Sequence, residues 1–341
     1  MRVAVYYNNK DVKIEERSIP EINDDEILIK VMASGICGTD VLEWYRIKKA
    51  PLVLGHEIAG VVDKVGKNVK GFKIGDRVTA THHVPCMKCH YCLNGHHTAC
   101  ETLHKTNFEP GGFSEYIRMP KINVEIGTLK LPDNVSFDEG TFVEPLGTVV
   151  RAQRLANLKE NQTLLVIGSG ISGLMHIKLA KSKNIKKIIA VDINEYRLNA
   201  AKRFGADFVI NATEDVVSKL KQLNENRLAD LVIVCTGALP AVKQALQCVD
   251  KGGTILFFAV PKPDESFEIP INDFWRNEIK IMTSYAASPD DLKESLRLMA
   301  NGRIKMKDMI THKLEFDEIQ KGFNLVAEAK DSLKVIVEIN N

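Results

Sequence analysis

The first part of the chain alternates short β-branched runs with turn residues. The runs occupy residues 3–7, 26–33, 58–65 and 77–81, and glycines at 66, 71 and 75 separate them. Runs of this length and composition, bounded by turn residues, predict short β-strands. We therefore expect residues 1 to about 145 to form a β-rich domain.

From Gln162 onward the apolar positions are grouped differently. Near-continuous apolar runs stand at residues 164–167, 188–191, 231–234 and 254–258. Between them lie stretches with helical patterning, such as residues 195–204 and 239–249. Fully apolar strands that alternate with amphipathic helices indicate a parallel sheet covered on both faces.

The last part of the chain predicts helices at residues 290–299 and 317–329 and a final strand at 334–339. A chain of 341 residues is too long for one ordinary core. We expect an α/β protein with two domains. A doubly wound domain of residues 146–285 is inserted near the end of the β-rich domain, which takes residues 1–145 and 286–341.

Composition narrows the class of protein. Hydrophobic residues make up 45% and charged residues 26% of the chain, as in soluble globular proteins. The net charge of +2 comes without a basic tail, so we expect no nucleic-acid and no membrane partner. The N-terminus reads directly as a strand, and no apolar run reaches the roughly 18 residues of a membrane span. These features favour a cytoplasmic protein.

Four of the seven cysteines are grouped at Cys86, Cys89, Cys92 and Cys100. Two consecutive C-x2-C steps and a seven-residue gap can wrap one tetrahedral ion, and four thiolates suit a closed structural zinc site. The alternative is a loop of free or disulfide-bonded cysteines. Adjacent C-x2-C pairs leave little room for unstrained disulfides, and a reducing compartment disfavours them, so we predict a structural zinc ion.

A glycine motif follows the first apolar run of the predicted parallel sheet. It consists of Gly168, Gly170, Ile171, Ser172 and Gly173 in the pattern G-x-G-x-x-G, and a helical pattern follows it. In this context the glycines allow a tight turn, close approach of a pyrophosphate and close helix–strand packing. The helix N-terminus offers unpaired N–H groups to the phosphates. The alternative is a tight turn without a cofactor.

The next predicted strand ends at Asp192. A carboxylate there can accept hydrogen bonds from the adenosine-ribose hydroxyls, and it repels a 2′-phosphate. We therefore expect NAD rather than NADP. Arg197 lies close enough in sequence to be a candidate contact for the cofactor as well.

Cys37 and His56 form the start of a second candidate metal site. Together with one carboxylate they supply three protein ligands and leave a fourth position for water or substrate, which is what catalytic zinc requires. Taken singly, Cys37 could be a small buried apolar side chain and His56 an ordinary loop histidine. The four grouped cysteines at residues 86–100, which we call the knuckle, and the glycine motif in the same chain favour the metal site.

These motifs, in this order, resemble the zinc-dependent medium-chain dehydrogenases. The resemblance covers essentially the whole chain and implies a GroES-like catalytic domain and a Rossmann domain. It implies that Cys37, His56 and Glu144 bind the catalytic zinc, with Glu57 as a ligand or near-ligand. It also implies that Asp40 orients the histidine and that Thr148 packs near the nicotinamide.

Two positions bear on the branch of the family and on the mechanism. A carboxylate at Glu144, where alcohol dehydrogenases have cysteine, resembles the polyol, sugar and threonine dehydrogenases, and it leaves the zinc more Lewis acidic. Many members place a proton-relaying histidine where this chain has Leu42. The relay must then run through Thr39 and water, through Glu43, or through a zinc-bound carboxylate.

The resemblance implies a zinc-dependent oxidoreductase that transfers hydride between a secondary hydroxyl of a polyol, sugar or sugar acid and NAD. We expect two zinc ions per chain and a homodimer or homotetramer. The charged and aromatic residues after the first ligand loop and the histidines from His82 onward suit a polyhydroxylated substrate, although a solvated loop explains them equally well. The former are Trp44, Tyr45, Arg46, Lys48 and Lys49. The alternatives are an L-threonine or simple secondary alcohol dehydrogenase, a zinc-free quinone or enone reductase, and a nucleotide-binding, metal-stabilised non-enzyme.

Overall fold

The computed structural model describes residues 1–340. These residues form two compact units: the first unit comprises residues 1–147 and 286–340, and the second comprises residues 148–285. The boundary inferred from the sequence, after residue 145, lies two residues before the structural one. Within the described part of the chain, no helix is both long enough and apolar enough to cross a membrane.

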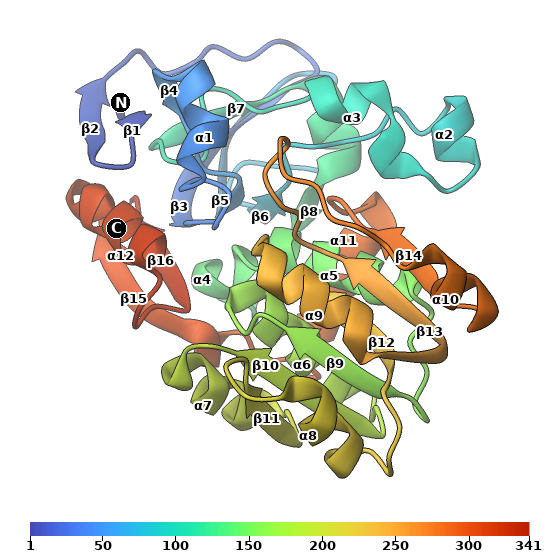
Figure 1. Cartoon of the computed structure of the whole chain (residues 1–341). Helices are drawn as coiled ribbons and strands as arrows, with labels where there is room; N and C mark the ends of the chain where they lie inside the picture. The colour runs from blue at the N-terminus through green and yellow to red at the C-terminus, as the bar shows by residue number, and fades with distance from the viewer. Residues whose placement is uncertain (341) are drawn as a thin grey trace. The chain divides into compact units, whose positions relative to one another are not determined.

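The first unit is built mainly of β-strands (Figure 1). Its larger sheet has seven strands in the order β15-β16-β3-β5-β6-β8, with β7 paired to β3. These strands are β3 (Ile27–Gly35), β5 (Glu57–Val65), β6 (Arg77–Ala80), β7 (Tyr116–Met119), β8 (Thr128–Lys130), β15 (Ile310–Glu315) and β16 (Lys334–Glu338). A smaller sheet has the order β2-β1-β4, with β1 (Arg2–Asn8), β2 (Asp11–Glu16) and β4 (Leu52–Val53).

Strand β3 is central to the first unit. It pairs antiparallel with β5 on one side, and with β7 and β16 on the other. Most of its residues are buried, and Ile29 and Val31 pack in a core that also contains Val337 from β16 and Phe323. The C-terminal segment therefore completes the sheet that the N-terminal strands begin.

Short helices connect the strands of the first unit, and two longer ones come from the C-terminal segment. They are α1 (Glu43–Arg46), η1 (Ile47–Lys49), α2 (His90–Leu93), η2 (His97–Ala99), α3 (Glu101–Lys105), η3 (Asn123–Gly127), α4 (Phe137–Gly140), α11 (Pro289–Ala300), η4 (Lys307–Met309), η5 (Phe316–Glu318) and α12 (Ile319–Glu328). Helix α11 starts with Ser288 and Asp291 in a capping box, which satisfies N–H groups that lack a partner within the helix. Helix α5 (Val143–Leu155) contains the boundary between the units.

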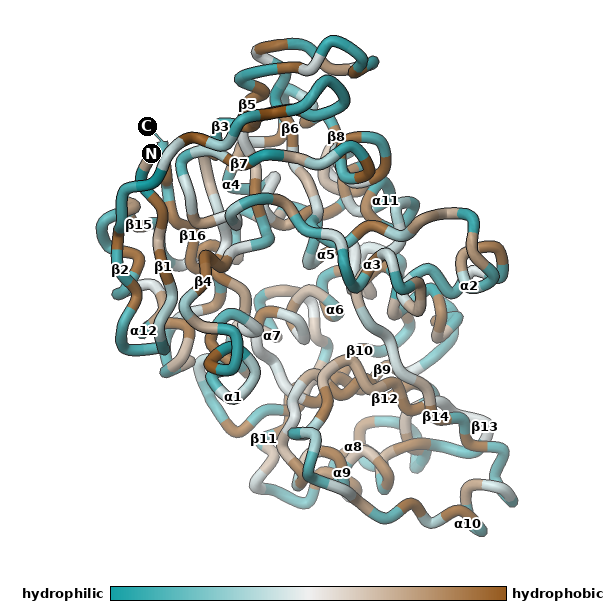
Figure 2. Tube along the Cα trace, turned by 90° about the horizontal axis from the view of Figure 1, so that it is seen from above, coloured by the Kyte–Doolittle hydropathy of each residue, from teal (hydrophilic) through white to brown (hydrophobic). Residues whose placement is uncertain are grey.

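The second unit contains a six-stranded, fully parallel sheet. Its strands are β9 (Thr163–Ile167), β10 (Lys187–Asp192), β11 (Phe208–Asn211), β12 (Ala229–Val234), β13 (Val249–Phe257) and β14 (Lys280–Thr283). They lie in the order β11-β10-β9-β12-β13-β14, which is the doubly wound order of dinucleotide-binding sheets. Strands β9, β10 and β12 are strongly hydrophobic in Figure 2. The predicted fold class is confirmed.

Four helices of the second unit form two pairs. Helices α6 (Ile171–Ser182) and α7 (Glu195–Phe204) contact each other, as do α8 (Val216–Leu223) and α9 (Leu239–Cys248); α10 (Ile271–Arg276) precedes β14. The apolar pattern of the sequence did not predict β11 and β14, which are the two edge strands of the sheet. Both are partly exposed, so neither shows the continuous apolar run that marks the inner strands.

Candidate metal and dinucleotide sites

Three residues of the first unit bring a sulfur, a nitrogen and an oxygen together. The candidate ligand atoms of Cys37, His56 and Glu57 all lie within 4.8 Å of one another. Cys37 stands just after β3 and Glu57 begins β5, and the two strands are antiparallel neighbours with Gly35 opposite Glu57. Strand pairing therefore assembles this group, which we call the mixed cluster.

Asp40 lies behind the histidine of the mixed cluster and is completely buried. Its Oδ1 is 3.5 Å from His56 Nδ1 and 3.6 Å from Arg46 Nη2, and its Oδ2 accepts the Cys37 N–H at 3.1 Å. Burial opposes ionisation of Asp40, but the charges of His56 and Arg46 lower its pKa below the usual value. Since Nδ1 of His56 faces Asp40, Nε2 is the nitrogen left for a metal.

Burial also opposes a charge on His56, yet the carboxylate of Asp40 and the thiolate of Cys37 raise the pKa of the imidazole well above its usual value. The surroundings of His56 thus favour a positive charge. A divalent cation bound by Cys37, His56 and Glu57 supplies such a charge, and the thiolate, imidazole and carboxylate donor set is one that zinc takes. The residues of the mixed cluster fit a zinc ion.

Thr39 and Glu43 were two of the three alternatives for the proton relay, and the structure brings only Thr39 to the mixed cluster. The Thr39 hydroxyl donates to Cys37 Sγ at 3.3 Å and accepts from Arg46 Nη2 at 3.3 Å. Glu43 instead accepts the Asn9 N–H at 3.1 Å and is exposed to solvent. Leu42 is exposed as well.

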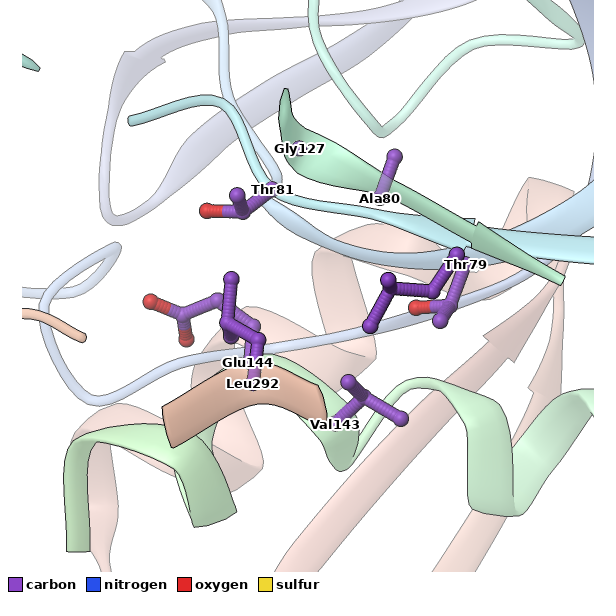
Figure 3. A pocket seen from close by; sticks show the side chains of 8 residues that line it. Thr79, Ala80, Thr81, Gly127, Val143, Glu144 and Leu292 are labelled. Atoms are coloured by element: carbon purple, nitrogen blue, oxygen red, sulfur yellow. The ribbon is translucent and has the colours of Figure 1, made fainter. Parts of the chain in front are cut away.

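Glu144 is not one of the three residues whose ligand atoms form the mixed cluster. It is the second residue of α5 and lines a narrow pocket of the first unit with Thr81 and Leu292. In Figure 3 the oxygens of Glu144 and Thr81 point toward the same side of this pocket. Burial raises the pKa of Glu144 to about 7, while the nearby charge of His56 opposes the rise.

Two further side chains lie at the mixed cluster: Lys334, to which the sequence assigned no role, and His82, one of the histidines expected near a polyhydroxylated substrate. Lys334, the first residue of β16, is buried and forms an ion pair with Glu57; its only sequence signal is a lysine at the head of an apolar strand. His82 follows β6, and its ring centroid lies 5.0 Å from that of His56. Burial lowers the pKa of His82 well below its usual value, so the ring is neutral, and its Nδ1 is buried without a hydrogen-bond partner.

The four predicted knuckle cysteines form a second cluster. The sulfur atoms of Cys86, Cys89, Cys92 and Cys100 all lie within 4.8 Å of one another, in the segment that carries α2 and α3 (Figure 1). Cys100 Sγ accepts the Cys86 N–H at 3.3 Å. Burial opposes ionisation of Cys100, but backbone N–H groups lower its pKa to about 6. Four sulfurs converging in this way fit a closed tetrahedral zinc site, and none of the seven cysteines, all in the described range, is in a disulfide.

The glycine motif connects β9 to α6 in the second unit. Gly168 has a φ of +93°, and a Cβ on Gly173 would overlap the carbonyl oxygen of Gly168. Nothing lies within 4 Å of the place where a Cβ of Gly170 would stand. Ile171 and Ser172 open α6, which has no side-chain cap at Gly170. The N–H groups of the first helical turn are therefore available to a pyrophosphate.

Asp192 ends β10 beside this loop. Its Oδ2 accepts the Ser169 N–H at 2.7 Å and its Oδ1 accepts the Asn194 N–H at 2.9 Å. Each oxygen keeps a second lone pair for a ribose hydroxyl. Arg197 lies in the first turn of α7, and Thr148 is the first residue of the second unit.

Two family models match most of the chain. Residues 23–133 match the alcohol dehydrogenase GroES-like domain, and residues 172–301 match the zinc-binding dehydrogenase model. The chain is 35% identical to the probable D-xylulose reductase A of Aspergillus clavatus, over 97% of this chain and 94% of the relative. It is 32% identical to the sorbitol dehydrogenase of Bacillus subtilis, over 100% of this chain and 98% of the relative.

A solved structure with a similar fold is the alcohol dehydrogenase TADH from Thermus sp. ATN1. It superimposes with a TM-score of 0.89 at 29% identity and covers 100% of both chains. The agreement extends through both units of the present chain.

Proposed function

The chain belongs to the zinc-binding dehydrogenases with an alcohol dehydrogenase GroES-like domain, and we propose that it oxidises a secondary hydroxyl of a polyol, sugar or sugar acid with NAD⁺. The family uses zinc and a nicotinamide cofactor. The products of the proposed reaction are the ketone, NADH and a proton. Relatives named D-xylulose reductase and sorbitol dehydrogenase support this class of substrate.

The mixed cluster carries the proposal. A thiolate, an imidazole and a carboxylate that converge within 4.8 Å offer three ligands of different kinds, whereas a structural zinc site takes four and is closed. Cys37, His56 and a carboxylate would hold the catalytic ion. Glu57 fits this role by its position in the cluster, and Glu144 would join from the neighbouring pocket.

The side chains around the mixed cluster have separable roles in the proposed reaction. When bound, zinc supplies a Lewis acid that lowers the pKa of a hydroxyl, and NAD⁺ supplies the hydride acceptor. Asp40 holds the imidazole of His56 in one orientation. The hydroxyl of Thr39 accepts the substrate proton and passes it on. Arg46 holds Thr39 in place, because its Nε donates to the Thr39 carbonyl at 2.9 Å and its Nη2 donates to the Thr39 hydroxyl at 3.3 Å.

His82 favours a substrate with more than one hydroxyl. Its ring lies beside that of His56, and its buried Nδ1 has no partner within the described residues. An unpaired buried polar atom is costly, so a ligand hydroxyl that bonds to it contributes binding free energy. A simple alkyl alcohol offers no second hydroxyl for this role.

The remaining parts of the proposal concern the cofactor, the oligomer and the compartment. Asp192 at the end of β10 favours NAD over NADP, because a carboxylate repels a 2′-phosphate. Edge strand β14 and the exposed apolar side chains of Ile271, Trp275 and Ile281 favour a homodimer or homotetramer. The absence of disulfides among the described cysteines is consistent with a reducing cytoplasm.

The test measures NADH formation against polyols, sugar acids, sugar phosphates, L-threonine and small secondary alcohols, with zinc determined on the same sample. We expect two zinc ions per chain and turnover of at least one polyhydroxy compound. Turnover of L-threonine alone would move the enzyme to the amino-alcohol dehydrogenases. One zinc ion per chain and no turnover would contradict the dehydrogenase mechanism.

A further inference from the structure

Lys334 is a fully enclosed lysine in a strand that otherwise reads as core. Its side chain is 2% exposed, as is that of Glu57, with which it forms an ion pair. Its Nζ also donates to the Ile36 carbonyl at 3.4 Å and lies 5.5 Å from the ring centroid of Phe142. A buried lysine without an anion would be strongly unfavourable, so Glu57 and Lys334 depend on each other.

The backbone around this pair leaves room for it. Gly35, at the end of β3, is paired with Glu57 in β5 and with Ile336 in β16. A Cβ on Gly35 would overlap Glu57 Oε2 and lie 2.7 Å from Lys334 Cε. The ion pair therefore occupies the space that a side chain at position 35 would need. One oxygen of Glu57, Oε2, accepts the hydrogen bond from the lysine.

The charges around the mixed cluster balance only when this lysine is counted. A zinc ion together with Lys334 carries as much positive charge as the Cys37 thiolate and the carboxylates of Glu57 and Glu144 carry negative charge. Asp40, the remaining acid, already has Arg46 at 3.6 Å. Without Lys334 the buried group would carry one excess negative charge directly beside a potential metal ligand.

We propose that Lys334 is a positioning residue that withholds one oxygen of Glu57 from the catalytic metal, so that a coordination position remains for Glu144 or substrate. The inference rests on the proposed function, because it concerns the zinc of the mixed cluster. Glu57 would then act on a metal mainly through Oε1, because the ammonium of Lys334 competes for the charge of Oε2. Loss of the lysine frees both oxygens, increases the negative charge at the ion and fills the position that the substrate hydroxyl needs.

The test compares Lys334→Met with Lys334→Arg and with the matched control Lys313→Met. Lys313 is a half-exposed lysine of β15 with carboxylate partners of its own, Asp138 and Glu338. The first readout is the rate at which a chromogenic chelator removes the more labile zinc ion. We expect Lys334→Met to slow this release at least about tenfold, because an unpaired buried carboxylate attracts the ion more strongly, and Lys334→Arg and Lys313→Met to leave it close to the parent rate.

The second readout is the visible spectrum of enzyme with Co²⁺ in the mixed cluster. A higher coordination number weakens the d–d bands, and we expect this change in Lys334→Met and not in Lys334→Arg. The KM for the alcohol should rise while the KM for NAD⁺ stays unchanged. Faster zinc release, or an unchanged release rate and spectrum together with lower stability, would overturn the proposal and leave Lys334 a purely structural partner.

Two controls keep the result interpretable. If Lys334→Met does not fold, Lys334→Gln takes its place; its uncharged amide holds Glu57 more weakly than the ammonium does, so a slower release is expected from it as well, but by a smaller factor than from Lys334→Met. Parent enzyme with two zinc ions and measurable turnover establishes the proposed function independently. A parent with one zinc ion or no turnover counts against the proposed function. An active parent whose Lys334 variants show its own zinc release rate and Co²⁺ spectrum counts against this inference alone.

Discussion

The two cysteine-containing clusters of the first unit are built in opposite ways. The knuckle takes its four sulfurs from one continuous segment of fifteen residues, 86–100, and needs only local turns to bring them together. The mixed cluster takes its donors from β5 and from the ends of two loops, and its charge partners from α1 and from β16 near the C-terminus. A local cluster can fold around its ion, whereas a dispersed one exists only after the sheet has formed.

The largest difference should appear when each cluster loses a cysteine. Cys100→Ser is expected to destabilise the first unit by more than about 4 kcal/mol, because metal binding by a local knuckle is folding free energy. Cys37→Ser should instead lower kcat/KM at least about 10³-fold by removing a ligand of the Lewis acid. The measurements are denaturant unfolding, zinc content and turnover for both variants.

Each variant is the control for the other, and both should retain one zinc ion per chain. If Cys37→Ser unfolds as readily as Cys100→Ser, the mixed cluster is also structural and the contrast between the two clusters is lost.

Asp40→Asn tests whether the mixed cluster depends on its supporting charges. An amide at this position cannot stabilise a positive histidine or hold the same tautomer, so zinc affinity and kcat/KM should fall about 10- to 100-fold. Competition with a chelator of known affinity measures the first and steady-state kinetics the second. The knuckle zinc should be unaffected, and its loss in this variant would contradict the independence of the two clusters.

A buried histidine of the second unit provides a contrast with His56. His176 is fully enclosed in α6, its ring centroid lies 4.7 Å from that of Phe258, and burial lowers its pKa to about 3. Because the unfolded chain binds a proton at this residue near pH 6.5 and the folded chain only near 3, stability falls as the pH drops through that window. Between pH 7 and 5 the loss amounts to about 2 kcal/mol.

His176→Leu should remove this dependence while leaving the free energy of unfolding at pH 7 within the range of an ordinary core substitution. Urea titrations of both proteins at pH 7 and pH 5 measure the difference. An equal loss of stability in the variant would show that other groups account for the acid sensitivity.

The glycine loop is a second locally encoded site, and the expected effect there is the smallest. Gly170→Ala meets open space, so the fold should persist while the added methyl group weakens NAD⁺ binding by about tenfold. Gly173→Ala is the contrasting variant, since its methyl group would overlap the Gly168 carbonyl and should lower stability first. Cofactor titration and thermal unfolding separate the two, and an unchanged NAD⁺ affinity in folded Gly170→Ala would argue against a pyrophosphate at this loop.

Features formed within one short segment could be predicted from the sequence, whereas features assembled from distant segments could not. The inner strands of the second unit were recognised because their apolar runs are continuous, and β14 was missed because its residues are largely exposed. The convergence of the knuckle sulfurs follows from spacing alone. Glu144 was grouped with the ligands by resemblance, whereas the structure places Glu57 with Cys37 and His56 and puts Glu144 in the adjoining pocket. The roles of these residues in binding zinc stay predictions.

The sequence by itself determined the class of the two domains, the knuckle and the glycine loop, because each depends on periodicity or on spacing within one short segment. Only the tertiary structure decided which carboxylate meets Cys37 and His56, and that Arg46 and Lys334 accompany Asp40 and Glu57. The physical reason is that charge balance in a buried site depends on distance in space. The pairing of β3 with β5 and with β16 brings Glu57 and Lys334 together. No short stretch of the sequence could have predicted this contact.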